Sequence, residues 1–314
     1  TSFESLKDQV IFEKDEILSD TGNPYVVYSP YMRKWVSKFR ISLTAKYDSE
    51  SLLDNLSTIS DVDELTSLEQ MGFKHVNYNL KEPDLSVESL KNYEDSRNFP
   101  SQEGTINLSV HLRFGFLSVR ELAKVAYQYS ETLLKELIWR SFFCQILWRH
   151  PHVVNSCFKT KFENLDWSQD HHLFLKWKRG VTGYPIVDAG MRELFETGYM
   201  HNRVRMVTAS FLVKNLGINW RLGEAYFASM LIDYDLASNN GNWQWVAGTG
   251  CDSAPYFRVF NPVSQQEKFD GNFEYCRKWL PEMDENGKYV VEKVVDVKRS
   301  RLEAIARYKV CTNN

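Results

Sequence analysis

The amino-acid sequence predicts an all-α fold. From about residue 100 onwards, apolar residues recur at the three- and four-residue spacing of amphipathic helices. Residue types that start and end helices separate these stretches, and strand-like alternation is nearly absent. The 314 residues are 43% hydrophobic and 14% aromatic, so the chain can bury a large core.

The first 75 residues are expected to be less regular. The run "VIF" at 10–12 is a candidate strand, and "DTGNP" at 20–24 predicts a turn. Residues 40–70 are rich in serine, aspartate and leucine without long periodicity, which indicates a linker with about one helical turn. The predicted division is the end of a preceding domain at 1–30, an interdomain linker at 31–75 and a helical domain at 76–314.

Two helices are predicted between residues 118 and 149. Ser118 and Glu121 form a capping box that opens the first helix. The second helix spans about residues 131–149 and is stopped by Pro151. One face of it carries a carboxylate, an indole and a guanidinium beside a phenyl ring, at Glu136, Trp139, Arg140 and Phe143.

The next two helices follow from proline, glycine and apolar spacing. Pro185 suits the first turn of one helix, and Gly198 suits its end. Residues 200–217 predict another helix. The side chains that share one face of this helix are Asn202, Arg205, Met206 and Ala209.

Two further segments are predicted from residue 220 onwards. "WRLGEAYFASMLIDYD" at 220–235 predicts a helix whose last turn carries Asp233 and Asp235. The negative end of the helix dipole repels carboxylates at this position. We therefore expect a cationic partner, such as a nearby arginine, to stabilise them. "ASNNGNWQW" at 237–245 predicts irregular backbone, because three asparagines and a glycine lie beside Trp243 and Trp245.

Several kinds of site are excluded. No G-x-G-x-x-G lies between a strand and a helix, and no P-loop, H-E-x-x-H or G-x-S-x-G occurs. The five cysteines include no C-x-x-C pair, so we expect reduced thiols. No metal site is predicted, since the spacing matches no common zinc pattern in the cluster of Cys144, His150, His152 and Cys157.

Charge and hydropathy restrict the location and the partners. No apolar run approaches the roughly 18 residues of a membrane span. The first residues are too polar for a signal peptide, so we expect a soluble protein of the cytoplasm, or of the nucleus in a eukaryote. The net charge is −7 over residues 1–100 and +4 over residues 101–314. A polyanion is therefore expected to bind the C-terminal two-thirds.

Long contiguous motifs resemble a known family. They include "KELIWR" at 135–140, "TGYPIVDAGMREL" at 182–194, "LIDYDLASNNGNWQW" at 231–245 and "GTGCDSAPYFRVFNPVSQQEKFD" at 248–270. These motifs, with "MHNRVRMVTASFLVKNLGINWRLGE", are similar to the FAD-binding helical domain of the photolyase/cryptochrome family. The resemblance covers nearly the whole chain and is greatest to the class I cyclobutane pyrimidine dimer photolyases.

The resemblance implies that the helical domain binds FAD in a U-shape. Hydroxyl and guanidinium donors suit a diphosphate, and Asn239 resembles the family's residue beside the flavin N5. Relatives often have a large aromatic residue at the position of Leu133. The matching cofactor positions are Tyr93, Thr105, Ile106, Asn107, Leu108, Ser109, Leu133, Arg140, Asn202, Arg205, Asp233, Asp235 and Asn239.

The resemblance also implies a site for UV-damaged DNA. A pyrimidine dimer flipped out of the duplex presents stacked bases, which suit flat aromatic walls at Trp139 and Trp245. Glu136 is expected to hydrogen-bond or protonate a base edge. The matching substrate positions are Arg97, Glu136, Trp139, Arg140, Asn202, Arg203, Met206, Trp245 and Gln265.

The implied reaction is light-driven repair by electron transfer from photoexcited reduced FAD to the dimer, performed by a monomer without membrane contact. Glu136 and Asn239 are the implied catalytic positions beside the flavin and the lesion. A tryptophan chain for flavin photoreduction matches Trp243 nearest FAD, Trp220 in the middle and Trp167 at the surface. A folate or deazaflavin antenna chromophore is expected only with the family's N-terminal α/β domain, whose last strand "VIF" would be.

Structural roles are the alternatives at these positions. Single tryptophans and Met206 commonly fill cores, and Arg203 and Arg205 could be surface charges. Asp233 and Asp235 could cap a following turn. His201 is expected to be structural, because "MHNRVRM" lacks the histidine pair of (6-4) photoproduct repair enzymes. The alternative functions are a cryptochrome-type blue-light photoreceptor without repair and, more remotely, a flavin redox enzyme that needs no light.

Overall fold

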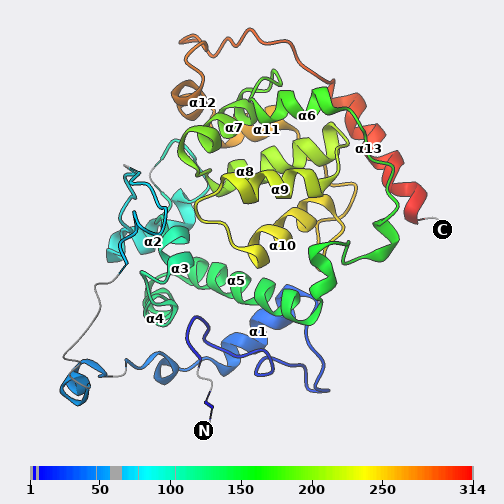
Figure 1. Cartoon of the computed structure of the whole chain (residues 1–314). Helices are drawn as coiled ribbons and strands as arrows, with labels where there is room; N and C mark the ends of the chain where they lie inside the picture. Colours follow the sequence, from blue (N-terminus) through cyan, green and yellow to red (C-terminus); the bar gives the residue numbers. More distant parts are fainter. Residues whose placement is uncertain are drawn as a thin grey trace.

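The computed structural model describes residues 3–4, 7–46, 48–56, 66–76, 78–102 and 104–312. These residues contain two isolated β-bridges and no strand, which confirms the all-α prediction (Figure 1). The α-helices are α1 (Tyr28–Lys38), α2 (Val87–Ser96), α3 (Leu108–Phe114), α4 (Val119–Tyr129), α5 (Glu131–Arg149), α6 (His171–Lys178), α7 (Pro185–Thr197), α8 (Asn202–Ser210), α9 (Trp220–Met230), α10 (Leu236–Ala247), α11 (Pro262–Phe269), α12 (Glu274–Trp279) and α13 (Val297–Thr312). Short 3-10 helices span Ile41–Thr44, Glu50–Asn55, Pro151–Val154 and Thr160–Phe162, and a π-helix spans Phe211–Asn215.

The N-terminal part is more ordered than the sequence predicts. The predicted strand at 10–12 is wrong: residues 11 and 12 form a bend, and residue 10 has no regular structure. Ile11 is buried in the helical core, and Phe12 meets Trp35 edge-on with ring centroids 5.2 Å apart. The turn at 20–24 is confirmed, with Gly22 at φ 78°.

Two helices and a second 3-10 turn were not predicted in this region. Helix α1 buries Tyr28, Tyr31 and Trp35, which follow one another at helical spacing. Helix α2 begins after Ser86, whose Oγ accepts a hydrogen bond from Ser89 N. The linker has two 3-10 helices in place of a single turn, and its residues 47 and 57–65 lie outside the described residues.

The predicted helix boundaries from residue 118 to 198 are confirmed. Helix α4 follows Ser118, whose Oγ accepts a hydrogen bond from Arg120 N at 3.3 Å. Helix α5 ends at Arg149, before Pro151. Helix α7 begins at Pro185, and Gly198 ends it at φ 66°.

The predicted helix over 200–217 forms, but its last turn is a π-helix. His201 caps α8, because its Nδ1 accepts a hydrogen bond from Arg203 N at 3.1 Å. In the π-helix, Lys214 is buried and its Nζ donates to the carbonyl oxygen of Ala247, the last residue of α10, at 2.9 Å. A donor at this position interacts favourably with the negative end of the α10 dipole.

Two predictions around residue 235 are wrong. Helix α9 ends at Met230, so Asp233 lies beyond it and Asp235 caps the next helix by accepting from Ser238 N at 2.8 Å. The segment 237–245 is not irregular, since it lies within α10. Its asparagines are compatible with a helix because their side chains find partners: Asn240 donates to Val153 O and Asn242 to Ser238 O.

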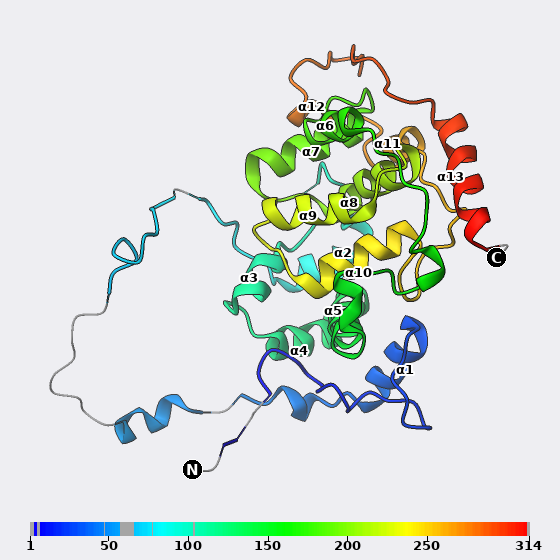
Figure 2. The same ribbon diagram turned by 45° about the vertical axis from the view of Figure 1, so that its right-hand side comes forward.

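Helix α10 lies between two hydrophobic cores and contributes residues to both. One core gathers around α7, α8 and α9, and the other gathers around α1, α4 and α5. Helix α10 packs against both α5 and α9 (Figure 2). Gly241 faces the ring of Phe143 on α5, and the ring of Trp243 lies against Gly223 on α9, so glycine on either side permits close approach. The polar start of α10 is thereby placed at the junction of the two cores.

Candidate functional site

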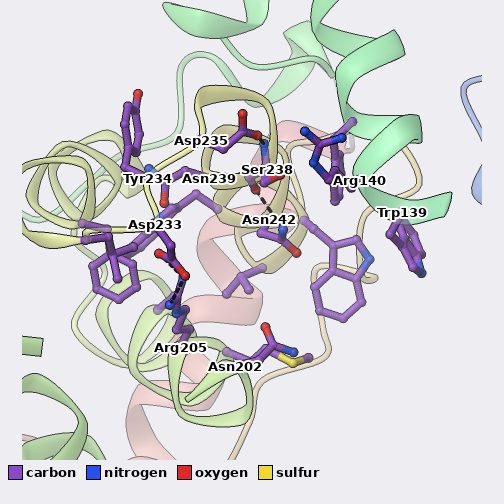
Figure 3. A pocket seen from close by; sticks show the side chains of 18 of the residues that line it. Trp139, Arg140, Asn202, Arg205, Asp233, Tyr234, Asp235, Ser238, Asn239 and Asn242 are labelled. Carbon is purple, nitrogen blue, oxygen red and sulfur yellow. Dashed lines mark hydrogen bonds and ion pairs between the residues drawn. The ribbon is translucent and has the colours of Figure 1, made fainter. Parts of the chain in front are cut away.

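Two adjoining cavities of about 400 and 290 Å³ lie at this junction. Both are within the range of about 300–1,000 Å³ that is usual for ligand pockets, or close to it. The walls of the larger cavity come chiefly from α5, α8 and α10 (Figure 3). Those of the smaller cavity come chiefly from α3, the segment just before it, and α5. The residues that line both cavities are Glu136, Arg140, Asn202, Arg205, Asp233, Asp235 and Ser238.

An ion pair between Arg205 and Asp233 stands where the cavities meet. The guanidinium donates from Nη1 and Nη2 to the two carboxylate oxygens at 3.2 and 2.8 Å, and from Nε to Met200 O at 2.7 Å. Burial raises the pKa of Asp233, but the charge and hydrogen bonds of Arg205 outweigh burial and bring the pKa below its ordinary value. The pair therefore stays charged and fixed in orientation.

The first turn of α10 presents an oriented amide. Asn239 Nδ2 donates to Glu224 O at 3.2 Å and to Glu224 Oε1 at 2.8 Å. A backbone carbonyl can only accept, so the amide nitrogen must face Glu224 and Oδ1 must face away from it. Glu224 was not predicted from the sequence, where it reads as an ordinary helix charge.

Glu136 is held by an arginine. Arg97 Nη1 donates to Glu136 Oε1 at 2.7 Å, and its guanidinium lies 5.2 Å from the ring of Tyr93. Burial lowers the pKa of Arg97, but the hydrogen bond and charge of Glu136 outweigh burial and bring the pKa above its ordinary value. Arg97, expected to contact the DNA backbone, is thus placed to orient Glu136 in the larger cavity.

Aromatic side chains form walls of the larger cavity. Trp139 and Trp245 both line it, together with Met206. Trp139 is stacked on Tyr28, and the guanidinium of Arg258 lies 5.9 Å from the ring of Trp245. Flat apolar surfaces therefore adjoin the Glu136 carboxylate.

Arg203 is held on the same helix as Met206. Its Nη2 donates to Asn98 Oδ1 at 2.6 Å, and its guanidinium lies 4.4 Å from the ring of Phe269. Burial lowers the pKa of Arg203, and the positive charges of Arg97 and Arg258 lower it further. Positive charge is therefore concentrated along this rim of the larger cavity.

The smaller cavity gathers the predicted cofactor residues of the N-terminal half. Asn107 there adopts left-handed backbone at φ 53°, just before α3. Tyr199 and Gln9, which also line this cavity, were missed, because neither lies in a motif that marks it. The predicted residues that line the cavity are Tyr93, Thr105, Ile106, Asn107, Leu108, Ser109 and Leu133.

This donor set fits FAD. A diphosphate needs hydroxyl, amide and guanidinium donors, and Thr105, Ser109 and Arg140 offer such groups in the smaller cavity. A flavin ring needs flat apolar contacts and polar groups at its edge, and Phe227, Trp243 and Asn239 offer these in the larger cavity. The two cavities are joined at the Arg205–Asp233 pair, as a folded dinucleotide requires.

Some predicted residues lie away from the cavities. Gln265 is half-buried on α11 and lines neither of them. Trp243 lines the larger cavity and contacts Phe227 and Trp177, with ring centroids 5.0 and 6.3 Å apart. Trp220 is buried in the same core as Trp243.

Trp167 was expected at the surface and is buried, with 8% of its side chain exposed. The ring of Tyr308 covers it edge-on, with centroids 6.3 Å apart. Sequence alone could not predict this contact, because α13 is far away in the chain.

Two kinds of feature are absent from the part of the chain that the structure describes. It contains no group of three or more histidine, cysteine, aspartate or glutamate side chains that could hold a metal ion. It also contains no helix that is both long and apolar enough to cross a membrane.

Comparisons with known proteins agree with this geometry. The family model described as the FAD binding domain of DNA photolyase matches residues 133–310. The chain is 39% identical to the deoxyribodipyrimidine photo-lyase of Alkalihalophilus pseudofirmus, over 90% of this chain and 62% of that protein. The chain thus spans about three-fifths of that relative.

Solved structures are also similar. The class III photolyase from Agrobacterium tumefaciens superimposes with a TM-score of 0.81 and 31% identity, over 98% of this chain and 73% of that one. A cryptochrome from Synechocystis superimposes with a TM-score of 0.79 and 27% identity, over 96% and 72%. The family model covers more than half of the chain, and the chain therefore belongs to the DNA photolyase/cryptochrome family and carries its FAD-binding domain.

Proposed function

We propose that the protein is a deoxyribodipyrimidine photo-lyase, which repairs cyclobutane pyrimidine dimers in DNA with the energy of light. The observation that carries this proposal is the larger cavity, where the aromatic walls Trp139 and Trp245 and the carboxylate of Glu136 adjoin the FAD compartment. The names of the similar proteins support it.

The FAD would be held by residues of both cavities. Thr105, Ser109 and Arg140 would bind the diphosphate, and the Arg205–Asp233 pair would fix the bend between the two halves. Asn239, oriented by Glu224, would present its amide to the flavin edge. When bound, reduced and excited by light, FAD would supply the electron that opens the dimer ring.

The lesion would enter the larger cavity as a flipped-out dinucleotide. Its bases would stack on Trp139 and Trp245, at about 1–3 kcal/mol per stacked base in comparable sites. Glu136, oriented by Arg97, would accept hydrogen bonds from a base edge. Met206 would fill the space between the bases and the ring of the cofactor.

The DNA backbone would be bound along the rim. Arg203 has a guanidinium held in place but not ion-paired to a carboxylate in any contact of the described residues, which leaves its charge for a phosphate. Asn202, the neighbouring residue, is exposed. Gln265 lies on α11, the helix that also carries Phe269, and the Arg203 guanidinium lies over the Phe269 ring. Arg140, with Nη1 on Gln9 O at 3.1 Å, would serve both the cofactor and the DNA.

Three tryptophans would carry electrons towards the flavin compartment. Trp243 lies at the cavity wall, and Trp220 and Trp167 are buried in the same core. This chain is proposed from the family resemblance and from the burial of all three rings.

We also propose that residues 76–314 form the FAD- and lesion-binding domain, with a linker at 31–75. The segment before residue 31 would end an α/β domain, although Ile11, Ile17 and Tyr28 share the α5 core with the helical domain. A folate or deazaflavin antenna would belong to that α/β domain. The enzyme would act as a monomer in the compartment that holds the DNA.

The test is repair of a thymine-dimer oligonucleotide by reduced, FAD-loaded protein under blue light. Repair that depends on light, and that is lost in Trp139→Ala together with lesion binding, would support the proposal. A second candidate is a blue-light photoreceptor, favoured by the similarity to the Synechocystis cryptochrome. Bound FAD that photoreduces without any repair would support that second function.

A further inference from the structure

Trp220 differs from the other two proposed carriers in the charge beside its ring. It is the first residue of α9 and is 1% exposed. The guanidinium carbon of its neighbour Arg221 lies 4.9 Å from the centroid of the Trp220 ring. Within the described residues, no lysine or arginine lies over the ring of Trp167 or Trp243.

Arg221 is held in this position by hydrogen bonds and an ion pair. Its backbone N donates to Asn219 Oδ1 at 3.1 Å, and its Nε donates to Asn155 O at 3.1 Å. Its Nη2 forms an ion pair with Glu163 Oε1 at 2.6 Å. The guanidinium is therefore a fixed charge over the ring, with 27% of the Arg221 side chain exposed.

Glu163 stays ionised in this cluster. Burial raises its pKa, but hydrogen bonds from Cys157 and the charge of Arg221 bring it below the ordinary value. Its Oε2 accepts from Cys157 N at 2.7 Å. The positive charge over Trp220 thus belongs to an ion pair whose negative member is Glu163.

An electron-deficient Trp220 would keep its full positive charge. The indole Nε1 is buried, and the acceptor that faces it is the sulfur of Cys157. Burial raises the pKa of the neighbouring Cys157 thiol to about 11, so this sulfur is no base. A guanidinium attracts the electron-rich face of a neutral indole but repels an indole that has lost an electron.

We propose that Arg221 is a positioning residue for electron transfer, which destabilises the oxidised form of Trp220 and so drives the electron vacancy outward to Trp167. This inference rests on the proposed tryptophan chain. In the step concerned, one electron passes from Trp167 to the oxidised Trp220 ring, and no bond is made or broken. The primary oxidant is a light-excited oxidised flavin acting through Trp243, and a thiol-class reductant finally restores Trp167.

The two members of the ion pair should have opposite effects. Arg221→Gln removes the repelling charge and leaves Glu163, so the vacancy stays on Trp220 and returns to the flavin; flavin photoreduction yield should fall roughly threefold or more. Glu163→Gln leaves Arg221 uncompensated, so the yield should be equal to or above that of the wild type. Arg221→Lys keeps the charge and should restore most of the yield.

The experiment measures tryptophan-radical decay by transient absorption in the FAD-loaded protein, with urea unfolding of each variant alongside. Arg192→Gln is the matched control, because Arg192 and Glu282 form an ion pair of similar exposure that touches none of the three tryptophans. Equal falls in yield for Arg221→Gln and Glu163→Gln, in step with stability, would overturn the proposal. If Trp220→Phe abolishes photoreduction but Arg221→Gln leaves it unchanged, the chain stands and the role of Arg221 fails. If Trp220→Phe leaves photoreduction unchanged, the proposed chain itself fails, and this inference fails with it.

Discussion

The ring of Tyr28 lies flat against the ring of Trp139, with centroids 3.6 Å apart and 5° between their planes. Tyr28 is itself anchored at both ends. Its backbone N donates to Asp252 Oδ2 at 3.0 Å, and its hydroxyl donates to Lys135 O at 2.8 Å. The first residue of α1 therefore fixes the plane of a wall of the larger cavity.

Replacing Tyr28 should weaken lesion binding without loss of FAD. A stacked aromatic pair contributes about 0.5–1.5 kcal/mol beyond buried area, so Tyr28→Leu should lower affinity for a thymine-dimer oligonucleotide by roughly 2- to 10-fold. Tyr28→Phe keeps the stack and should bind almost as the wild type does. Fluorescence anisotropy measures the affinity, and flavin absorbance checks the cofactor. Equal binding by Tyr28→Leu and wild type would show that Trp139 is held by other contacts.

The Arg205–Asp233 pair should be needed for both stability and FAD retention. Asp233→Asn leaves the guanidinium without its counter-charge in a largely buried place, which costs about 3 kcal/mol when one partner of such a pair is removed. Asp235→Asn is the matched control for stability alone, because asparagine also caps helices well, whereas Asp235 itself lines both cavities. Urea unfolding and the flavin-to-protein absorbance ratio measure the two effects. Similar losses of stability in both variants would contradict a special role for the pair.

Acid should destabilise the protein through His201. Burial, followed by the charges of Arg203 and Arg205, lowers the pKa of His201 from 6.5 to about 4. Between these values the unfolded chain binds more protons than the folded one, so the stability present above pH 6.5 is lost as the pH falls to 4. The loss is about 3 kcal/mol for a shift of this size.

His201→Asn tests this pH dependence, because asparagine keeps a side-chain acceptor for Arg203 N but does not titrate. The free energy of unfolding is measured in urea at several pH values from 7 to 4. The difference between wild type and variant should shrink or reverse towards pH 4. A constant difference across this range would mean that His201 does not titrate in the folded protein.

Backbone binding and lesion recognition should separate in Arg203→Gln and Trp139→Ala. Loss of one phosphate contact should weaken damaged and undamaged DNA alike, and should reduce the slope of log affinity against log salt by about 1. Trp139→Ala should leave this slope unchanged and reduce the preference for damaged DNA. A salt slope that Arg203→Gln does not alter would place the phosphate contacts elsewhere.

The sequence predicted those elements whose ends are marked by local chemistry. Pro151, Pro185 and Gly198 mark helix ends by their own backbone preferences, and all three predictions are confirmed. Residues of the cavities were found through motifs, and the structure brings most of them together. Contacts between distant segments, such as that of Tyr28 with Trp139, were beyond local patterns.

Helix α10 shows why local preference failed. Asparagine and glycine disfavour helix interiors, because asparagine side chains compete for backbone hydrogen bonds and glycine loses more entropy. Here Asp235 starts the helix, and Asn240 donates to Val153 of another segment. Tertiary contacts therefore outweigh propensity. Asp235, predicted to be an unfavourable charge at the end of one helix, is a favourable cap at the start of the next because its carboxylate accepts a hydrogen bond from Ser238 N.

Because α10 is a continuous helix, it couples the orientations of Trp243 and Trp245. Residues two apart on a helix point about 200° away from each other. Trp243 accordingly packs among Phe227 and Trp177, whereas Trp245 is only half-buried and lies towards Arg258. Any rotation of this one rod, for example by inserting a single residue after Asp235, would move both rings by about 100° at once. The proposed flavin reduction and the proposed lesion recognition therefore both depend on the orientation of α10, and variation that improves one by turning this helix is expected to disturb the other.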